Sequence, residues 1–265
     1  MKFRPAILTS HRVLLLFLVL VFAWSIFSVN WSGPIIHTGG RSSFLKLWWS
    51  LFPPDLTPDF LWIASQATWT TFTFAVMGIV LAITLGLPMG VIASGILFER
   101  SSVNRVPIII VFRGLLAGMR AVHELVWAVV LVVAIGLSPV AGIIALGIPY
   151  AGILGRIYAE LLQSTPRAPI DALSQTGASQ LKILFYGYIP AVLPDMLSYT
   201  FYRFECSIRA AAILSFIGIQ GLGYQIQLSL HDLMFDQVWT LLLFLILLIV
   251  LVDLWSTRIR RSLLA

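Results

Sequence analysis

Long apolar stretches occupy most of this chain, and they limit it to a fold whose helices cross a lipid bilayer. A membrane span needs roughly 20 apolar residues to cross a hydrocarbon core about 30 Å thick. Stretches long enough to span lie at residues 13–29, 67–94, 106–136, 139–162, 189–217 and 237–257. Only 11% of the 265 residues are charged and 59% are hydrophobic, which is too few charges to cover a soluble domain. The sequence predicts an all-α polytopic membrane protein with about six transmembrane helices.

The apolar stretches also divide the chain into segments. We expect an N-terminal transmembrane helix at 1–31, an extracytoplasmic or interfacial segment at 32–65, a transmembrane domain at 66–258 and a tail at 259–265. Lys2, Arg4 and Arg12 resemble the basic start of a signal peptide, but residues 30–32 offer no convincing cleavage site, so an uncleaved span is favoured. The stretch at 106–136 is either one broken helix or a short helix followed by a full span.

The cations predict the orientation, because membrane proteins concentrate Lys and Arg in cytoplasmic loops. With a cytoplasmic N-terminus and six spans, the outer loops hold only Arg41 and Lys46. The cytoplasmic segments then hold 11 of the 17 cations: Lys2, Arg4, Arg12, Arg100, Arg105, Arg156, Arg167, Lys182, Arg258, Arg260 and Arg261. We therefore expect both termini in the cytoplasm. The net charge of +6 reflects this topology and does not indicate a nucleic-acid partner.

The polar segment at 164–190 has a pattern that suits two short helices. Pro169 and Asp171 suit a first helical turn, the proline for its fixed φ and the carboxylate for the helix dipole. Small side chains leave a low-profile surface, and Gly177 permits a sharp turn into a second helix. From this chemistry alone two interpretations stay open. The segment is a plain connection between spans, or it is a docking element that moves the spans when a cytoplasmic partner moves.

The same segment resembles the EAA loop of ABC importer permeases, written E-A-A-x3-G-x9-I-x-L-P. In that family the loop is a coupling helix seated in a groove of the ATPase subunit. The resemblance assigns ATPase coupling to Asp171, Ala172, Leu173, Gly177, Ala178, Ile189 and Pro190. Asp171 stands where the family has Glu, Leu173 where it has the second Ala, and Gly187 where it has an apolar residue. We expect Gly187 to loosen the helix that enters the membrane.

Further runs are similar to the phosphonate-type branch of these permeases. They are RAVHELVWA at 120–128, GLSP at 136–139, YRFE at 202–205, Arg209-Ala210 and the glycine-rich 218–223, in the same order over about residues 65–261. The resemblance implies the type I ABC importer permease fold, in a bacterial inner membrane. It also implies inward transport of phosphonate, phosphite or a related phosphorus oxyanion.

The resemblance also implies partners. They are a second copy of the chain, a cytoplasmic ABC ATPase dimer and an extracytoplasmic solute-binding protein, all at the lipid bilayer. ATP and Mg would be bound by the ATPase, so we expect no cofactor, catalytic residue or metal site in this chain. No P-loop pattern G-x-x-x-x-G-K-[ST] occurs in the sequence, which agrees with that expectation.

Two groups of charges fall inside apolar stretches, where each charge costs at least ~2.5–3.5 kcal/mol at the bilayer centre. Arg120 and Glu124 are four residues apart, which predicts that they share one helical face. Glu205 and Arg209 have the same spacing, with Arg203 nearby. These groups either form ion pairs that hold helices together, or they face a water-filled pathway. In the second case arginine offers a bidentate fork to an oxyanion.

The glycine-rich run after the fifth apolar stretch predicts close helix packing or a flexible gate. Its candidates are Gly218, Gly221 and Gly223. No βαβ pattern surrounds the run, so a phosphate-binding loop is disfavoured. In the last apolar stretch, Asp253 could pair with Arg258 or its neighbours.

Other functions remain as alternatives: a secondary transporter or channel for anions, an ABC permease for a different small solute, and an intramembrane enzyme. A secondary transporter needs no coupling loop, and no convincing inverted repeat is visible. A hydrolase needs a nucleophile and base or a metal constellation, and no coherent set appears around His123, Glu124 or His231.

Overall fold

The computed structural model describes residues 7–29, 40–50, 52–98 and 105–264, and every regular element in those ranges is a helix. The chain forms two units, Met1–Trp49 and Ser50–Ala265. The first contains α1 (Ile7–Ser28) and α2 (Gly40–Trp49). The predicted end of the first span near residue 31 and the predicted cytoplasmic cations Lys2, Arg4 and Arg100 lie outside the described residues.

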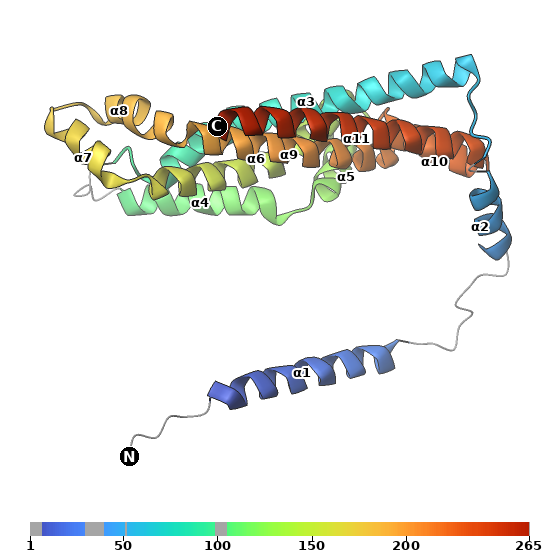
Figure 1. Ribbon diagram of the computed structural model, residues 1–265, viewed down its shortest axis with the longest axis horizontal. Helices are drawn as coiled ribbons and strands as arrows, with labels where there is room; N and C mark the ends of the chain where they lie inside the picture. The colour runs from blue at the N-terminus through green and yellow to red at the C-terminus, as the bar shows by residue number, and fades with distance from the viewer. Residues whose placement is uncertain (1–6, 30–39, 51, 99–104, 265) are drawn as a thin grey trace. The chain divides into compact units, whose positions relative to one another are not determined.

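The second unit is a bundle of long helices closed at its two ends by short ones (Figure 1). Its elements are α3 (Pro58–Ser94), α4 (Arg105–Ala121), α5 (Glu124–Ile135), α6 (Pro139–Ser164), α7 (Arg167–Gln175), α8 (Gln180–Ile183), the π-helical turn η1 (Leu184–Tyr188), α9 (Ile189–Leu214), the 3₁₀ turn η2 (Ser215–Ile217), α10 (Leu222–His231) and α11 (Phe235–Leu264). In Figure 1, α7 and α8 lie at one end of this unit and α10 lies at the other.

Three described helices are long and apolar enough to cross a membrane, namely α3, α6 and α11. Two bent pairs pass the same test together: α4 with α5, and residues 180–217 with α10. The described residues therefore hold up to five spans, and the apolar part of α1, Val13–Ser28, is shorter. The bundle confirms an all-α membrane fold, while the count of six spans stays a prediction.

The second span is longer than its apolar stretch predicted. We expected residues 67–94, but α3 begins at Pro58 and places eight residues of the expected interfacial segment, 58–65, in the helix. Pro58 suits the first helical position, and Asp59 in the first turn interacts favourably with the helix dipole. At the other end Gly95 adopts a left-handed conformation and stops the helix. Likewise α11 continues to Leu264, through most of the expected tail.

The third apolar stretch is a broken helix, which decides between the two predicted forms. α4 and α5 meet at 88° across a break at residues 122–123. His123 caps α5 by accepting a hydrogen bond from the Leu125 amide at 3.3 Å. The indole of Trp127 donates to the Met119 carbonyl oxygen at 3.3 Å and closes the corner.

The centre of the bundle depends on glycines where α3 crosses α6. A Cβ added to Gly90 would lie 2.5 Å from the carbonyl oxygen of Gly155, and one added to Gly86 would lie 2.9 Å from that of Ala151. The two backbones therefore touch, with Ala151 and Leu154 fully buried beside them. Small residues at helix crossings are the usual means of close packing within a membrane.

The end of the bundle opposite α7 is tied together by Asp55. Its carboxylate accepts hydrogen bonds from the Thr57 amide at 3.0 Å and from the Gln237 side chain at 3.4 Å. The Thr240 hydroxyl donates to its backbone carbonyl oxygen at 2.8 Å. The hydrogen bonds from Thr57, backbone first, hold the pKa of Asp55 below its ordinary value, and Gln237 adds a smaller effect. Asp55 thus joins the start of α3 to the start of α11.

This lowered pKa predicts an acid-dependent stability. A carboxyl whose pKa is lower in the folded state stabilises the fold above its unfolded value of 3.8, and the contribution is lost as the pH falls through the folded pKa. We expect Asp55→Asn to lower the thermal unfolding midpoint at pH 6, and the difference from wild type to shrink below pH 3.8. Asp195→Asn, at an exposed carboxyl beyond the first turn of α9, is the control. A midpoint difference for Asp55→Asn that is constant with pH would contradict this role.

Candidate functional site

The coupling loop, residues 164–190, forms a short helix, a turn and a second helix at one end of the bundle (Figure 1). Gly177 has φ +76° and makes the predicted turn. The expected position of Asp171 in the first helical turn is wrong, because α7 begins at Arg167, directly after Pro166. Asp171 and Ala172 instead lie further along the helix, where both are exposed. An exposed helix face of this kind is available to a partner.

The loop packs back onto the start of α9 through Gly187. A Cβ added there would lie 2.8 Å from Cδ1 of Ile170 and 3.0 Å from Cδ1 of Leu173. Ile170 is buried in this contact. The surrounding residues 184–188 form a π-helical turn, which agrees with the expected loosening of the helix at Gly187. Leu173 and Gly187 therefore compensate for each other, the larger side chain filling the space that the glycine leaves.

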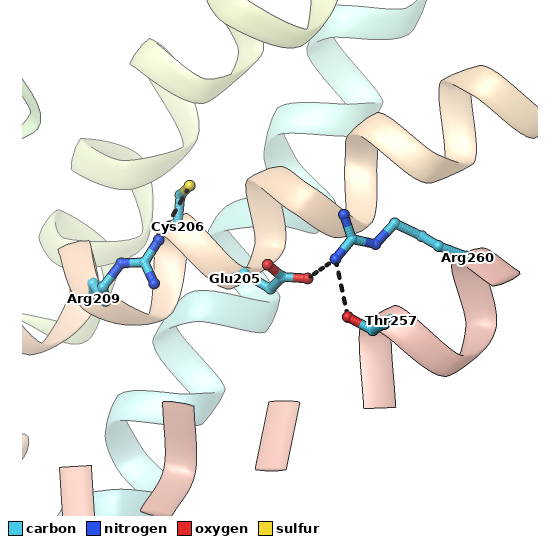
Figure 2. A network of polar contacts seen from close by, with 5 residues as sticks. All are labelled: Glu205, Cys206, Arg209, Thr257 and Arg260. Atoms are coloured by element: carbon cyan, nitrogen blue, oxygen red, sulfur yellow. Dashed lines mark hydrogen bonds and ion pairs between the residues drawn. The ribbon is translucent and has the colours of Figure 1, made fainter. Parts of the chain in front are cut away.

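Glu205 forms an ion pair with a residue far along the chain. Its Oε1 lies 2.8 Å from Nη2 of Arg260 on α11, and that nitrogen also donates to the Thr257 hydroxyl at 3.3 Å (Figure 2). The side chains of Glu205 and Arg260 are only 11% and 25% exposed. The pair joins α9 to α11 and neutralises a carboxylate within an apolar helix.

Of the two alternatives for Glu205 and Arg209, an ion pair between them is not what the structure has. In Figure 2 the carboxylate of Glu205 is turned toward Arg260, and the guanidinium of Arg209 reaches the sulfur of Cys206 at 3.5 Å instead. The i,i+4 spacing puts the two residues on the same side of α9, but Glu205 forms its charge-assisted bond with Arg260, at 2.8 Å. Arg209 is left exposed on the surface of the chain.

Arg203 is held by two tyrosines of its own helix. Its Nε and Nη2 donate to the Tyr199 hydroxyl at 3.0 Å and 2.6 Å. Its guanidinium carbon lies 5.1 Å from the ring centroid of Tyr199 and 5.5 Å from that of Tyr202. A cation over aromatic faces is stabilised electrostatically. Arg203 is therefore fixed in direction and half-buried.

The prediction that Arg120 and Glu124 share one helical face is wrong, because these residues lie on different helices across the 88° corner. Glu124 begins α5, and its carboxylate lies 3.7 Å from Nε2 of His123. Glu124 on α5 and Arg203 and Arg209 on α9 belong to helices that both pack against α6, which carries the buried Tyr150. We call Glu124, Tyr150, Arg203 and Arg209 the central charge cluster.

The glycine-rich run follows η2 and turns the chain into α10. Gly218 has φ +104°, a conformation that favours glycine. A Cβ at Gly223 would overlap the carbonyl oxygen of Ala212. The Leu222 amide donates to the Thr71 hydroxyl at 2.9 Å, which ties the run to α3. This geometry agrees with close packing, and a gating role for Gly218, Gly221 and Gly223 stays a prediction.

A family of known transport proteins matches most of the second unit. The sequence profile described as "Binding-protein-dependent transport system inner membrane component" matches residues 86–264. The chain belongs to this family. As a binding-protein-dependent transport system inner membrane component, it is a membrane permease. The matched region includes both the coupling loop and the central charge cluster.

Individual relatives of this inner membrane component extend over more of the chain. HtxC of Stutzerimonas stutzeri is 29% identical over 244 residues, which cover 91% of this chain and 84% of HtxC. PtxC of the same organism, a phosphite transport system permease protein, is 27% identical and covers 84% of this chain and 78% of PtxC. PhnE of Mycolicibacterium smegmatis, a phosphate-import permease protein, is 27% identical over 92% of this chain, which spans 44% of PhnE.

Solved structures agree on the fold of the inner membrane component. An inward-facing structure of the MetNI methionine ABC transporter aligns with a TM-score of 0.69 at 19% identity, covering 78% of this chain and 99% of that one. A bacterial ABC transporter involved in the import of alginate aligns with a TM-score of 0.59 at 15% identity, covering 95% of this chain and 96% of that one. The fold is that of an ABC importer permease.

Several residues of the permease were not found from the sequence as parts of the site. Arg260 was expected to be a loop cation, although it is the ion-pair partner of Glu205. Tyr150 carries no charge and lies within the apolar stretch at 139–162, where nothing distinguishes it in the sequence. The separations of 55 residues between Glu205 and Arg260 and 151 between Thr71 and Leu222 leave no local pattern to detect.

Proposed function

We propose that this chain is the membrane-spanning permease subunit of an ATP-driven importer for phosphorus oxyanions such as phosphonate or phosphite. The observation that supports it most directly is the coupling loop, which offers exposed residues Asp171 and Ala172 on a helix that packs onto the π-helical turn directly before α9. Relatives over most of the chain are named for phosphite and phosphate transport, which favours a phosphorus oxyanion as the cargo.

The partners follow from the same proposal. A cytoplasmic ATPase dimer binds ATP and Mg and seats the coupling loop, and an extracytoplasmic solute-binding protein delivers the cargo. Both termini are then in the cytoplasm. When the ATPases close, α7 pushes on the π-helical turn at Gly187, and α9 moves with it because the side chains of Ile170 and Leu173 fill the space above that glycine.

The central charge cluster supports a pathway between two copies of the chain. Arg209 is exposed on the surface of a single copy although it lies in an apolar helix. A guanidinium facing hydrocarbon is costly, so this surface faces water or a second copy. Arg203 and Arg209 together supply cationic donors suited to an oxyanion, and Glu124 balances part of their charge.

Uptake by the reconstituted complex tests this function. We expect ATP-dependent accumulation of labelled methylphosphonate or phosphite in vesicles that contain the permease, its ATPase and its solute-binding protein. Labelled sulfate and methionine serve as solutes of different chemistry. Accumulation that is driven by ATP but selects methionine would show that the cargo is methionine and not a phosphorus oxyanion. Accumulation that needs no ATP would favour a secondary transporter or channel.

A further inference from the structure

A second group of arginines surrounds a cavity that neither the coupling loop nor the central charge cluster includes. The cavity has a volume of about 340 Å³ and lies between α3, α4 and α6. Its polar lining is Arg113 and Arg120 of α4 with Arg156, Glu160 and Gln163 of α6. Small side chains, Ala93, Ala117 and Ala159, form the walls and leave the space open.

The cavity is built on a close contact between two helices. A Cβ added to Gly152 of α6 would lie 2.7 Å from the Leu116 carbonyl oxygen and 3.0 Å from the Arg120 amide nitrogen. This contact holds the backbone of Arg120 against Gly152, which lies about one helical turn before Arg156 on α6. Leu116 is 2% exposed and seals the inner side. The arginines are thus placed by backbone packing.

Single contacts anchor two of the arginines and leave their outer nitrogens available. Nε of Arg113 donates to the Ala93 carbonyl oxygen at 3.1 Å, and Nε of Arg156 lies 2.6 Å from Oε1 of Glu160. Within the described ranges, no acceptor contacts the terminal nitrogens of these two guanidinium groups or any side-chain nitrogen of Arg120. All three arginines line the same cavity.

The charge of this lining favours binding of an anion. Three guanidinium groups face one carboxylate, so the lining carries an excess of positive charge. Arginines on apolar helices are costly against hydrocarbon, and they favour planar, bidentate contacts with phosphate and related groups. The volume far exceeds the ~30 Å³ that one water occupies in the liquid, so a small tetrahedral anion fits with some of its hydration.

The cavity also leads toward the coupling loop. A neighbouring cavity of about 530 Å³ shares Gln163 with it and is lined by Arg105, Arg167 and Asp171. Gln163 donates to the Ser94 carbonyl oxygen at 2.7 Å at the boundary between the two. Polar side chains therefore line two adjacent cavities, from Arg120 beside the α4–α5 corner to the end of the bundle that holds α7.

We propose that Arg113, Arg120 and Arg156 form a binding site for a phosphorus oxyanion on the face between α4 and α6. The oxyanion is either the cargo on its way to the cytoplasm, which rests on the proposed function, or the headgroup phosphate of an anionic lipid. Glu160 holds Arg156 in position and weakens the site by its charge.

Arginine modification measures occupancy of this site directly. The full complex is placed in vesicles of phosphatidylcholine and treated with phenylglyoxal, which reacts with arginine, and labelling of each arginine is followed by mass spectrometry. We expect methylphosphonate to slow labelling of Arg113, Arg120 and Arg156 but not that of Arg258, which is exposed near the end of α11. If phosphatidylglycerol in the vesicles slows the same three arginines and methylphosphonate does not, the lipid headgroup is the source.

Two variants with opposite expected signs separate a binding site from a structural ion pair. We compare the concentration of methylphosphonate that halves the rate of arginine labelling. Arg156→Gln loses one charged donor, which raises this half-protecting concentration about tenfold. Glu160→Gln lowers that concentration severalfold, because it removes the only carboxylate among the described residues of the lining. An ion pair that only stabilises the fold predicts the same direction for both variants, and such a result would overturn the proposal. So would labelling that neither methylphosphonate nor phosphatidylglycerol slows.

The outcome is independent of the proposed function. ATP-dependent uptake is measured on the same vesicle preparations. ATP-dependent uptake without protection of the three arginines means that the oxyanion site is absent, while the proposed importer function still holds. Protection without ATP-driven uptake means that the oxyanion site is present and the importer is not.

Discussion

Replacing Glu205 by glutamine is expected to lower the free energy of unfolding by about 3 kcal/mol, near the lower end of the range for breaking a buried ion pair. The reason is the charge left behind, because Arg260 is mostly buried and its carboxylate partner lies at 2.8 Å. Among the described residues Nε of Arg260 already lacks a hydrogen-bond partner, so Glu205 supplies much of the compensation for burying the guanidinium. Unfolding of the purified chain in mixed detergent micelles measures the loss.

A second substitution tests that explanation. Arg260→Met in the Glu205→Gln background removes the orphaned cation, and we expect it to restore part of the lost stability. Arg258→Gln, at an exposed arginine two residues away, is the control and should change little. Equal losses for Glu205→Gln and Arg258→Gln would mean that the pair between α9 and α11 contributes nothing to the fold.

Replacing Gly90 by alanine is the other change with a large expected effect. The new Cβ would meet the Gly155 carbonyl oxygen at 2.5 Å, and a backbone atom within a helix cannot move aside as a side-chain end can. Overpacking of this kind costs about 1–3 kcal/mol, and we expect the upper end because two long helices must separate. The yield of folded chain and its unfolding midpoint measure this cost.

The matched control for Gly90→Ala is Gly118→Ala in α4. Nothing lies within 4 Å of a Cβ built on Gly118, so alanine should raise helix stability there by up to about 1 kcal/mol. The two glycine-to-alanine changes are thus expected to have opposite signs. A neutral Gly90→Ala would show that α3 and α6 do not touch at this crossing.

The helices of this permease could largely be predicted from the sequence, because the length of an apolar run is a local property. The stretch at 139–162 became α6 and that at 237–257 became the centre of α11. The start of α3 could not be predicted in the same way. Ser65 and Gln66 reduced the apolar character of 58–66, yet Pro58 and Asp59 are favourable helix-starting residues.

The intramembrane contacts were less predictable, since spacing along a helix says only which side of that helix a residue occupies. The Arg120–Glu124 interpretation required a continuous helix and failed at the break before His123. The Glu205–Arg209 interpretation had a continuous helix and still failed, because Arg260 comes from another one. In the coupling loop, by contrast, Gly177 was predictable because a turn with positive φ depends on the residue itself.

The most direct test of the central claim is to measure uptake and ATP hydrolysis together in wild type, Gly177→Val and Gly177→Asn. Both side chains project into open space within this chain, but a β-branched residue strains the +76° φ whereas asparagine tolerates it. If the turn transmits ATPase motion to α9, Gly177→Val should lose ATP-driven uptake, and Gly177→Asn should retain most of it. Uptake that continues without ATP and is the same in all three proteins would contradict the account.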